Sequence, residues 1–167
     1  MVYTPLNIKQ YIVEHTILSE TIPCVVDPAC GCGSFLITAI QWMHKKYRID
    51  ISKIIQNYIK GFDIDKHSIE KAETLLNVLC IQEEGKSFGK IKGLRNVNAL
   101  DEFSKMQYEN KYDVVIGNPP YVRAKNIEPN IKLSLKNWSV VSGNVDLYIP
   151  FYQLACYGRH KGTQMVA

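Results

Sequence analysis

Runs of consecutive apolar residues alternate along this chain with longer segments in which apolar residues recur every three or four positions. The runs predict buried strands and the longer segments predict amphipathic helices. We therefore expect strands at residues 24–26, 58–63, 94–100, 112–118 and 162–167, and helices at residues 5–19, from 34 onward, 51–58, 68–80 and 145–158. Residues 122–144 show neither period, which indicates a long functional loop or a broken helix.

The helical spacing also predicts which side chains face the core. The predicted inward residues are Leu6, Tyr11, Ile12 and Leu18 in the first helix, Phe35, Leu36, Ala39, Ile40 and Met43 in the second, and Ile69, Ala72, Leu75, Leu76 and Leu79 in the helix at 68–80.

Strands that alternate with helices predict an α/β fold with a doubly wound, mostly parallel sheet. Such sheets bind ligands beyond the carboxyl ends of their strands. Polar residues stand at or just after the ends of four predicted strands, namely Asp27, Asp63, Asn98 and Asn118. Because these ends share one edge of the sheet, we expect the four side chains to line a common site.

Composition changes this picture little. A length of 167 residues with 46% hydrophobic residues fits one domain with a sizeable core. The net charge of +4 permits nucleic-acid binding without indicating it. No apolar run reaches the ~18 residues of a membrane span, and the start "MVYTPLNIKQ" does not have the pattern of a signal peptide. We therefore expect a cytoplasmic protein that has no membrane partner.

The five cysteines are expected to be reduced thiols. Cys30 and Cys32 flank Gly31 in an apparent tight loop. A zinc site needs about four ligands, and no second Cys or His pair follows at suitable spacing. We expect no metal site.

The stretch "DPACGCGSFL" combines a glycine loop with an acid. Gly31 and Gly33 allow a sharp turn close to a ligand, although Leu36 occupies the third position of a dinucleotide fingerprint, so a plain strand-to-helix turn explains the glycines equally well. Asp27 would repel a pyrophosphate and favours a cationic group such as an amino group. Asp63, at the end of the next strand, is suited to two ribose hydroxyls, and Asp65 is the more natural helix N-terminal acid. S-adenosylmethionine, a nucleoside that carries an amino acid, fits both acids.

Four motifs now define a resemblance that covers nearly the whole chain. "YTP" at 3–5, "DPACGCGSFL" at 27–36, "GFDID" at 61–65 and "GNPPY" at 117–121 resemble, in this order, the motifs of adenine-N6 DNA methyltransferases of the gamma class. That class includes type I modification subunits and fused restriction–modification enzymes. The resemblance implies a Rossmann-like S-adenosylmethionine-dependent methyltransferase fold, here expected to be truncated after about the fifth strand.

The resemblance also implies roles for individual residues. Thr4 would contact the carboxylate of the cofactor, Asp27 its amino group, Asp63 its ribose and Ile64 its adenine ring, while Ala29, Cys30, Gly31 and Gly33 would supply surrounding backbone and Asn118 would border the same site. Asn98 stands where the family has an acid that reads the adenine amino group. Asparagine still offers a carbonyl oxygen as an acceptor but carries no charge.

The "NPPY" stretch, Asn118, Pro119, Pro120 and Tyr121, is expected to carry catalysis. The amino nitrogen of adenine is a poor nucleophile because its lone pair is conjugated into the ring. The Asn118 side-chain oxygen and the Pro119 carbonyl can accept its two N–H bonds, and Pro120 restricts the Pro119 backbone. Tyr121 would stack on a target base that has been flipped out of the duplex.

The sequence leaves two roles open for the basic residues near this stretch and indicates a structural role for a nearby acid. The basic residues of the irregular segment are expected either to contact DNA phosphates or to be solvated: Arg123, Lys125, Lys132 and Lys136. Asp146 resembles a later family motif, and we interpret it as structural.

Three other functions are compatible with parts of the sequence. A nicotinamide dehydrogenase conflicts with Asp27 and with "NPPY". A protein-glutamine methyltransferase also uses an "NPPY" motif but has a glycine loop less like this one. A non-catalytic cofactor-binding module of a restriction assembly is the third. The resembled proteins add a target-recognition region that residues 1–167 do not show, so we expect a fragment whose complete form binds double-stranded DNA together with restriction or specificity subunits.

Overall fold

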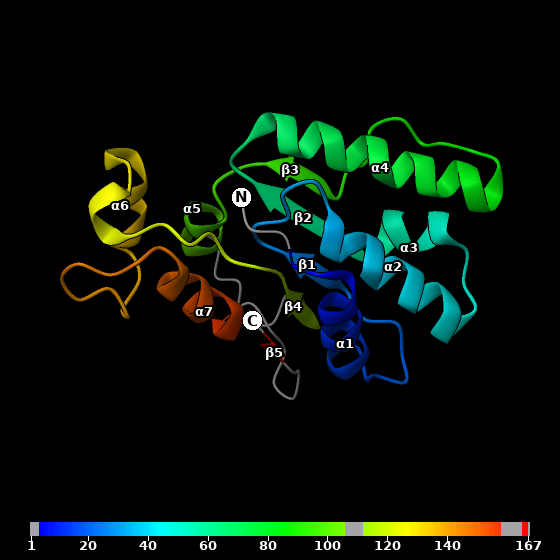
Figure 1. Cartoon of the computed structure of the whole chain (residues 1–167), viewed down its shortest axis with the longest axis horizontal. Helices are drawn as coiled ribbons and strands as arrows, with labels where there is room; N and C mark the ends of the chain where they lie inside the picture. Colours follow the sequence, from blue (N-terminus) through cyan, green and yellow to red (C-terminus); the bar gives the residue numbers. More distant parts are fainter. Residues whose placement is uncertain (1–3, 106–111, 158–164, 167) are drawn as a thin grey trace.

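A parallel sheet with helices on both faces forms the protein (Figure 1). The computed structural model describes residues 4–105, 112–157 and 165–166. Its elements are α1 (Leu6–Thr16), β1 (Val25–Asp27), α2 (Ser34–Tyr47), α3 (Ile51–Asn57), β2 (Ile59–Asp63), α4 (Lys66–Glu84), β3 (Leu94–Asn96), α5 (Ala99–Lys105), β4 (Val114–Ile116), a 3₁₀ turn η1 (Ala124–Asn126), α6 (Pro129–Leu135), α7 (Tyr148–Tyr157) and β5 (Met165–Val166).

The strand order β3-β2-β1-β4-β5 confirms the predicted doubly wound α/β fold. All pairings among the described strands are parallel, including that of β5, which places Met165 beside Val115. The chain leaves β1 toward β2 and β3 on one side and returns to β4 on the other. The carboxyl ends of β1 and β4 therefore form the switch point at which open α/β sheets bind their ligands.

Successive strand residues face opposite sides of the sheet and supply two separate cores. Val25 and Ile59 pack in a cluster with α1, α2, α3 and α4. Val26 and Phe62 pack in a second cluster with α5, α6 and α7. Figure 1 shows these two groups of helices on opposite sides of the strands. A buried strand covered on both faces explains why β1 and β4 are continuous apolar runs rather than alternating ones.

The helix after the glycine loop is confirmed in detail. α2 begins at Ser34 as predicted, and all five predicted inward residues are buried, namely Phe35, Leu36, Ala39, Ile40 and Met43. Asp65 is the N-cap of α4, where its carboxylate accepts the N–H groups of His67 and Ser68, as expected for a helix N-terminal acid.

The predicted inward face of the first helix was wrong in three of four positions. Ile12 is buried beside Val13 and Thr16, whereas Leu6, Tyr11 and Leu18 are exposed. Residues on a helix turn by ~100° each, so Tyr11 lies opposite Val13, and Leu18 lies beyond the helix end at Thr16.

Leu75 was likewise predicted to face the core and is 42% exposed. It lies at the margin of the buried stripe that Ala72, Leu76 and Leu79 form on α4. The same helix runs from Lys66 to Glu84, beyond both ends of the predicted 68–80 segment.

The predicted third strand at 94–100 was too long. β3 ends at Asn96, and Ala99 and Leu100 already belong to α5, a helix that the sequence pattern did not predict. Asn98 lies between the two elements, and its side-chain oxygen accepts the N–H of Leu100, as an N-capping side chain does. The apolar residues after Asn98 are therefore helical core residues.

The segment 122–144 is a broken helix, one of the two forms expected for it. It contains η1 and α6, and Ile127, Leu135 and Trp138 bury it against the second cluster. In the described part of the chain, no helix combines the length and apolarity that crossing a membrane would require.

Candidate active site

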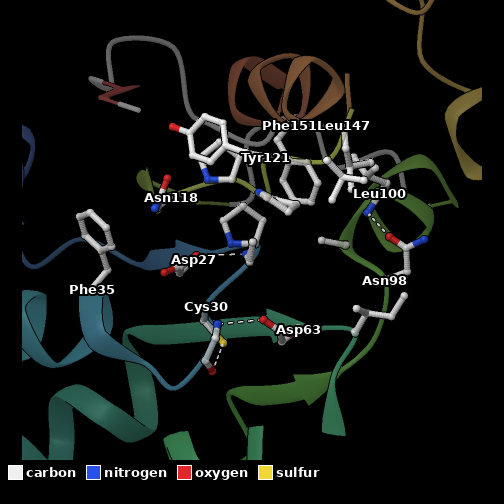
Figure 2. A pocket seen from close by; sticks show the side chains of 18 of the residues that line it. Asp27, Cys30, Phe35, Asp63, Asn98, Leu100, Asn118, Tyr121, Leu147 and Phe151 are labelled. Atoms are coloured by element: carbon white, nitrogen blue, oxygen red, sulfur yellow. Dashed lines mark hydrogen bonds between the residues drawn. The ribbon is translucent and has the colours of Figure 1, made fainter. Parts of the chain in front are cut away.

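A cavity of about 480 Å³ lies at the carboxyl ends of the strands (Figure 2). Every site residue predicted from the sequence lines it except Gly33: Thr4, Asp27, Ala29, Cys30, Gly31, Asp63, Ile64, Asn98, Asn118, Pro119, Pro120 and Tyr121. Its volume is in the range of small-molecule and cofactor sites. The four polar strand-end residues thus share one cavity, as the parallel topology predicted.

The glycine loop is fastened to the end of β2. The N–H of Cys30 donates to the Phe62 carbonyl at 2.9 Å, and the N–H of Gly31 donates to Asp63 Oδ2 at 2.8 Å. Gly33 lies outside the cavity lining; it is the N-cap of α2 with φ +82°, and a Cβ there would stand 3.2 Å from the Cβ of Ala72 on α4. Its glycine serves the turn and the helix packing.

Asp63 presents a carboxylate of fixed position. Its Oδ2 accepts Gly31 N–H and its Oδ1 accepts the N–H of Asp65 at 2.8 Å. Each carboxylate oxygen has a second lone pair, so Asp63 can still accept hydrogen bonds from a ligand. Ile64, the next residue, is 56% exposed beside it in the lining.

Asp27 is a buried acid at the switch point. It is 1% exposed, and its Oδ1 accepts the N–H of Ala29 at 3.0 Å. Burial raises its pKa to about 7, the Ala29 hydrogen bond opposes this rise, and the Asp63 charge adds to it. A cationic ligand group would favour the charged form of Asp27.

Gly117 brings β4 against this acid. A Cβ on Gly117 would lie 2.5 Å from Asp27 Oδ1, which is closer than real Cβ contacts. Asn118 follows directly, so the start of the "NPPY" stretch is set beside the end of β1. Figure 2 shows Asn118 above Asp27 in the same cavity.

Tyr121 projects an open ring from this wall. It is 65% exposed, and its ring centroid lies 5.9 Å from that of Tyr148. Tyr148 in turn lies 5.9 Å from Tyr152, edge to face. The chain after Tyr121 is held to the start of α7, because Asp146 Oδ1 accepts the N–H of Ala124 at 2.9 Å. This contact is consistent with the structural interpretation of Asp146.

Sequence reasoning missed the apolar wall of the cavity. This wall comes from segments far apart in the chain, namely Val97, Leu100, Ile131, Leu147 and Phe151. Figure 2 shows Leu100, Leu147 and Phe151 across the cavity from Asp27 and Cys30. Helical spacing marks such residues as apolar but does not distinguish a cavity wall from a core.

Lys9 was also missed. It is on α1, lines the cavity, and its Nζ donates to the Ser34 hydroxyl at the start of α2. Among the described lining residues it is the only basic one. Its closeness in sequence to Thr4 was the only available signal.

The remaining predicted groups are surface cations and cysteines, of which Cys30 and Cys80 are buried. Arg123, Lys125, Lys132 and Lys136 are exposed on η1, α6 and their flanks. All five cysteines are free, and burial raises the pKa of the Cys30 thiol. The described residues contain no group of three or more side chains arranged to hold a metal ion.

Comparison with known proteins identifies relatives of this fold and cavity. The family described as Eco57I restriction-modification methylase matches residues 37–165. The Type II methyltransferase M.BanIII of Aneurinibacillus aneurinilyticus is 30% identical over 131 residues, which cover 75% of this chain and 21% of that protein. M.VspI of Vibrio sp. (strain 343) is 30% identical over 143 residues, 85% of this chain and 29% of that protein.

Solved structures share the fold. A nuclease-deletion mutant of the Type ISP restriction-modification enzyme LlaGI, in complex with a DNA substrate mimic, superposes with a TM-score of 0.71 at 20% identity, covering 95% of this chain and 17% of the other. This chain thus spans under a third of the length of these relatives.

Proposed function

The chain belongs to the Eco57I restriction-modification methylase family, and from that premise we propose that the complete protein is a site-specific DNA adenine-N6 methyltransferase of a restriction–modification system. Its methyl donor would be S-adenosylmethionine, bound in the cavity at the switch point. The observation that carries the proposal is the close approach of Gly117 to Asp27, which joins the "NPPY" stretch to the acid end of that cavity.

The cavity residues fit this cofactor. Asp63 would accept the ribose hydroxyls while Gly31 N–H holds the carboxylate in place. Asp27 would pair with the amino group of the cofactor. The positive charge of that group would favour the ionised form of Asp27, whereas burial alone raises the pKa of Asp27. Lys9 and Thr4 would face the carboxylate of the amino-acid part, and the adenine ring would lie against Ile64 and the apolar wall.

The "NPPY" residues would prepare the nucleophile. Bound S-adenosylmethionine supplies an electrophilic methyl group. Asn118 Oδ1 and the Pro119 carbonyl would each accept one N–H of the adenine amine, which makes its lone pair available. They would also disperse the positive charge that develops on the nitrogen as it takes the methyl group. The donor sulfur would keep the electron pair of its broken bond to the methyl group, and the nitrogen would then release one proton to solvent. The Pro119 carbonyl would be held in place before reaction, because Pro120 restricts the Pro119 backbone.

The target base would be held by stacking. Extruding a base from the duplex costs a few kcal/mol, and stacking on an aromatic ring returns ~1–3 kcal/mol. Tyr121 is 65% exposed next to Asn118 and is supported from behind by Tyr148. A face of this kind is suited to a base that arrives from solvent.

We further propose double-stranded DNA and restriction or specificity subunits as partners of the complete protein. The exposed cations of η1 and α6 follow the "NPPY" stretch and are suited to phosphate contacts: Arg123, Lys125, Lys132 and Lys136. Sequence readout would require other parts of the protein, because such contacts carry no base information.

The test is methyl transfer by the complete protein. It is incubated with cofactor labelled on the methyl group and, in parallel reactions, with duplex DNA, RNA or a release-factor peptide that contains glutamine, and the DNA is digested to nucleosides. We expect the label in N6-methyladenine. Label in a release-factor glutamine peptide or in RNA, with none in DNA, would reject the proposal.

Asn118→Ala provides the matched variant for that test. Loss of one preorganised acceptor is expected to lower turnover by ~10²–10³-fold while cofactor affinity stays within about twofold. Asn57→Ala, an exposed site at the end of α3, is the control and should retain full turnover.

A further inference from the structure

We propose that Asn98 is a positioning residue: its side-chain amide joins α5 and α6 into one wall of the cofactor cavity, a role for which an acid beside Asp101 is poorly suited. The inference rests on the proposed function in so far as the cavity holds the cofactor. We call the residues involved the Asn98 junction; they are Asn98, Leu100, Asp101 and Ser134.

The orientation of the Asn98 amide follows from its neighbours. The N–H of Leu100 donates to Asn98 Oδ1 at 3.1 Å, so the oxygen must face Leu100. The amide nitrogen then donates to Asp101 Oδ2 at 3.0 Å and to the Ser134 hydroxyl at 3.0 Å. A flipped amide would set two donors against each other at Leu100 and two acceptors against each other at Asp101. Figure 2 shows the oxygen toward Leu100 and the nitrogen turned away from it.

Both amide hydrogens of Asn98 are therefore used inside the protein. What remains for a ligand is one lone pair on Oδ1. A carboxylate at position 98 has no hydrogen for Asp101 and would stand at hydrogen-bonding distance from its carboxylate, while the Ser134 hydroxyl would have to turn and act as the donor. Two like charges at that distance oppose each other, so the geometry of the junction favours an amide.

The junction fixes the relative positions of two residues that line the cavity. Leu100, on α5, is fully buried and lines the cavity. Ser134, on α6, is 4% exposed, and Ile131, one turn before it on the same helix, also lines the cavity. Because α6 belongs to the segment that follows the "NPPY" stretch, Asn98 links the cofactor wall to that segment.

Introducing an acid at position 98 is therefore expected to weaken cofactor binding, although an acid would be the better reader of an adenine amino group. A residue that acted only through the ligand would show the opposite result.

The experiment compares Asn98→Asp, Asn98→Ala and Ser134→Ala in the complete protein. Hydrogen exchange of residues 129–138 is measured by mass spectrometry without cofactor, and S-adenosylmethionine affinity is measured by calorimetry. Asn98→Asp should accelerate exchange in α6 and weaken binding by about tenfold or more, since a partly buried network loses the donor to Asp101 and gains a like-charge pair. Ser134→Ala should accelerate exchange in α6 with a smaller loss of affinity. Asn57→Asp, the same chemical change at an exposed site, should alter neither quantity.

Two further results decide the proposal. The double variant Asn98→Ala with Ser134→Ala should exchange no faster than Asn98→Ala alone, because both changes remove the same contact. Unchanged exchange in Asn98→Asp, or binding as tight as in the wild type, would overturn the junction. The exchange measurement involves neither cofactor nor methyl transfer, so it separates failure of this inference from failure of the proposed function.

Discussion

Asp27 and Gly117 approach each other so closely that a Cβ on residue 117 would stand only 2.5 Å from the Oδ1 atom of Asp27. One residue closes β1 and the other follows β4, and the two strands are neighbours at the switch point of the sheet. This contact sets the distance between the acid end of the cavity and Asn118.

Gly117→Ala is therefore expected to damage the site. The added methyl group must displace Asp27 or the β4 end, and overpacking of this kind lowers the free energy of unfolding by ~1–3 kcal/mol. Because Asp27 lines the cavity, we also expect cofactor affinity to fall in calorimetry. Gly89→Ala is the control, because Gly89 also has a positive φ but a Cβ there meets nothing within 4 Å. Wild-type affinity in Gly117→Ala would contradict the contact.

The raised pKa of Asp27 predicts a pH dependence of cofactor binding. Below pH 7 the acid holds a proton, because burial raises its pKa to about 7. Pairing with an amino group requires its charged form, so affinity should fall about tenfold per pH unit below 7 and level off above it. Calorimetry at several pH values checks this. Asp27→Asn should bind weakly and without that pH dependence.

The same shift predicts an opposite trend for the protein without cofactor. The pKa of Asp27 is higher in the folded state, about 7, than its ordinary value of 3.8. The contribution of Asp27 to the free energy of unfolding is therefore complete below pH 4 and is lost as the pH rises through 7. Denaturant titrations of wild type and Asp27→Asn should diverge over this window. Parallel pH profiles of the two proteins would refute the assignment.

Lys9→Met should weaken cofactor binding only because it removes the contact between Lys9 and the carboxylate of the cofactor. A charge-assisted hydrogen bond contributes ~1.5–3 kcal/mol, so a loss of ~10- to 100-fold is expected, and methionine preserves most of the apolar stem. 5′-Methylthioadenosine, which lacks the amino-acid part, is the control ligand, and its affinity should not change. An equal loss for both ligands would indicate that Lys9 acts by packing.

Tyr121→Ala should impair capture of the target base, whereas Tyr121→Phe should be mild because stacking uses the ring. The loss of stacking, ~1–3 kcal/mol, corresponds to about 5- to 150-fold. Fluorescence of 2-aminopurine at the target position reports the extruded base. Tyr11→Ala, at a tyrosine that is 61% exposed on α1, is the control. If Tyr121→Phe were as damaging as Tyr121→Ala, the hydroxyl would carry the role instead.

Local chemistry let the sequence predict much of this protein. β1, the glycine loop and the start of α2 were recognisable because the turn needs glycine and the following helix buries a complete apolar stripe, from Phe35 to Met43. The cavity lining contains the predicted Asp27, Asp63 and Asn118, since parallel strands place their carboxyl ends at one edge whatever the details of packing.

Only the tertiary structure decided the rest, because those features depend on neighbours distant in sequence. The apolar residues after Asn98 suit a strand or a helix equally, and packing against α6 and α7 made them α5. Tyr11 has a largely apolar ring and Ile12 is wholly apolar, and the position of α2 decided which of the two is buried. Lys9 became a cavity residue, and Asn98 a junction to Ser134, through contacts across 25 and 36 positions of the chain. Residue type and periodicity report what a side chain can do, whereas its partner is set by the packing of the whole domain.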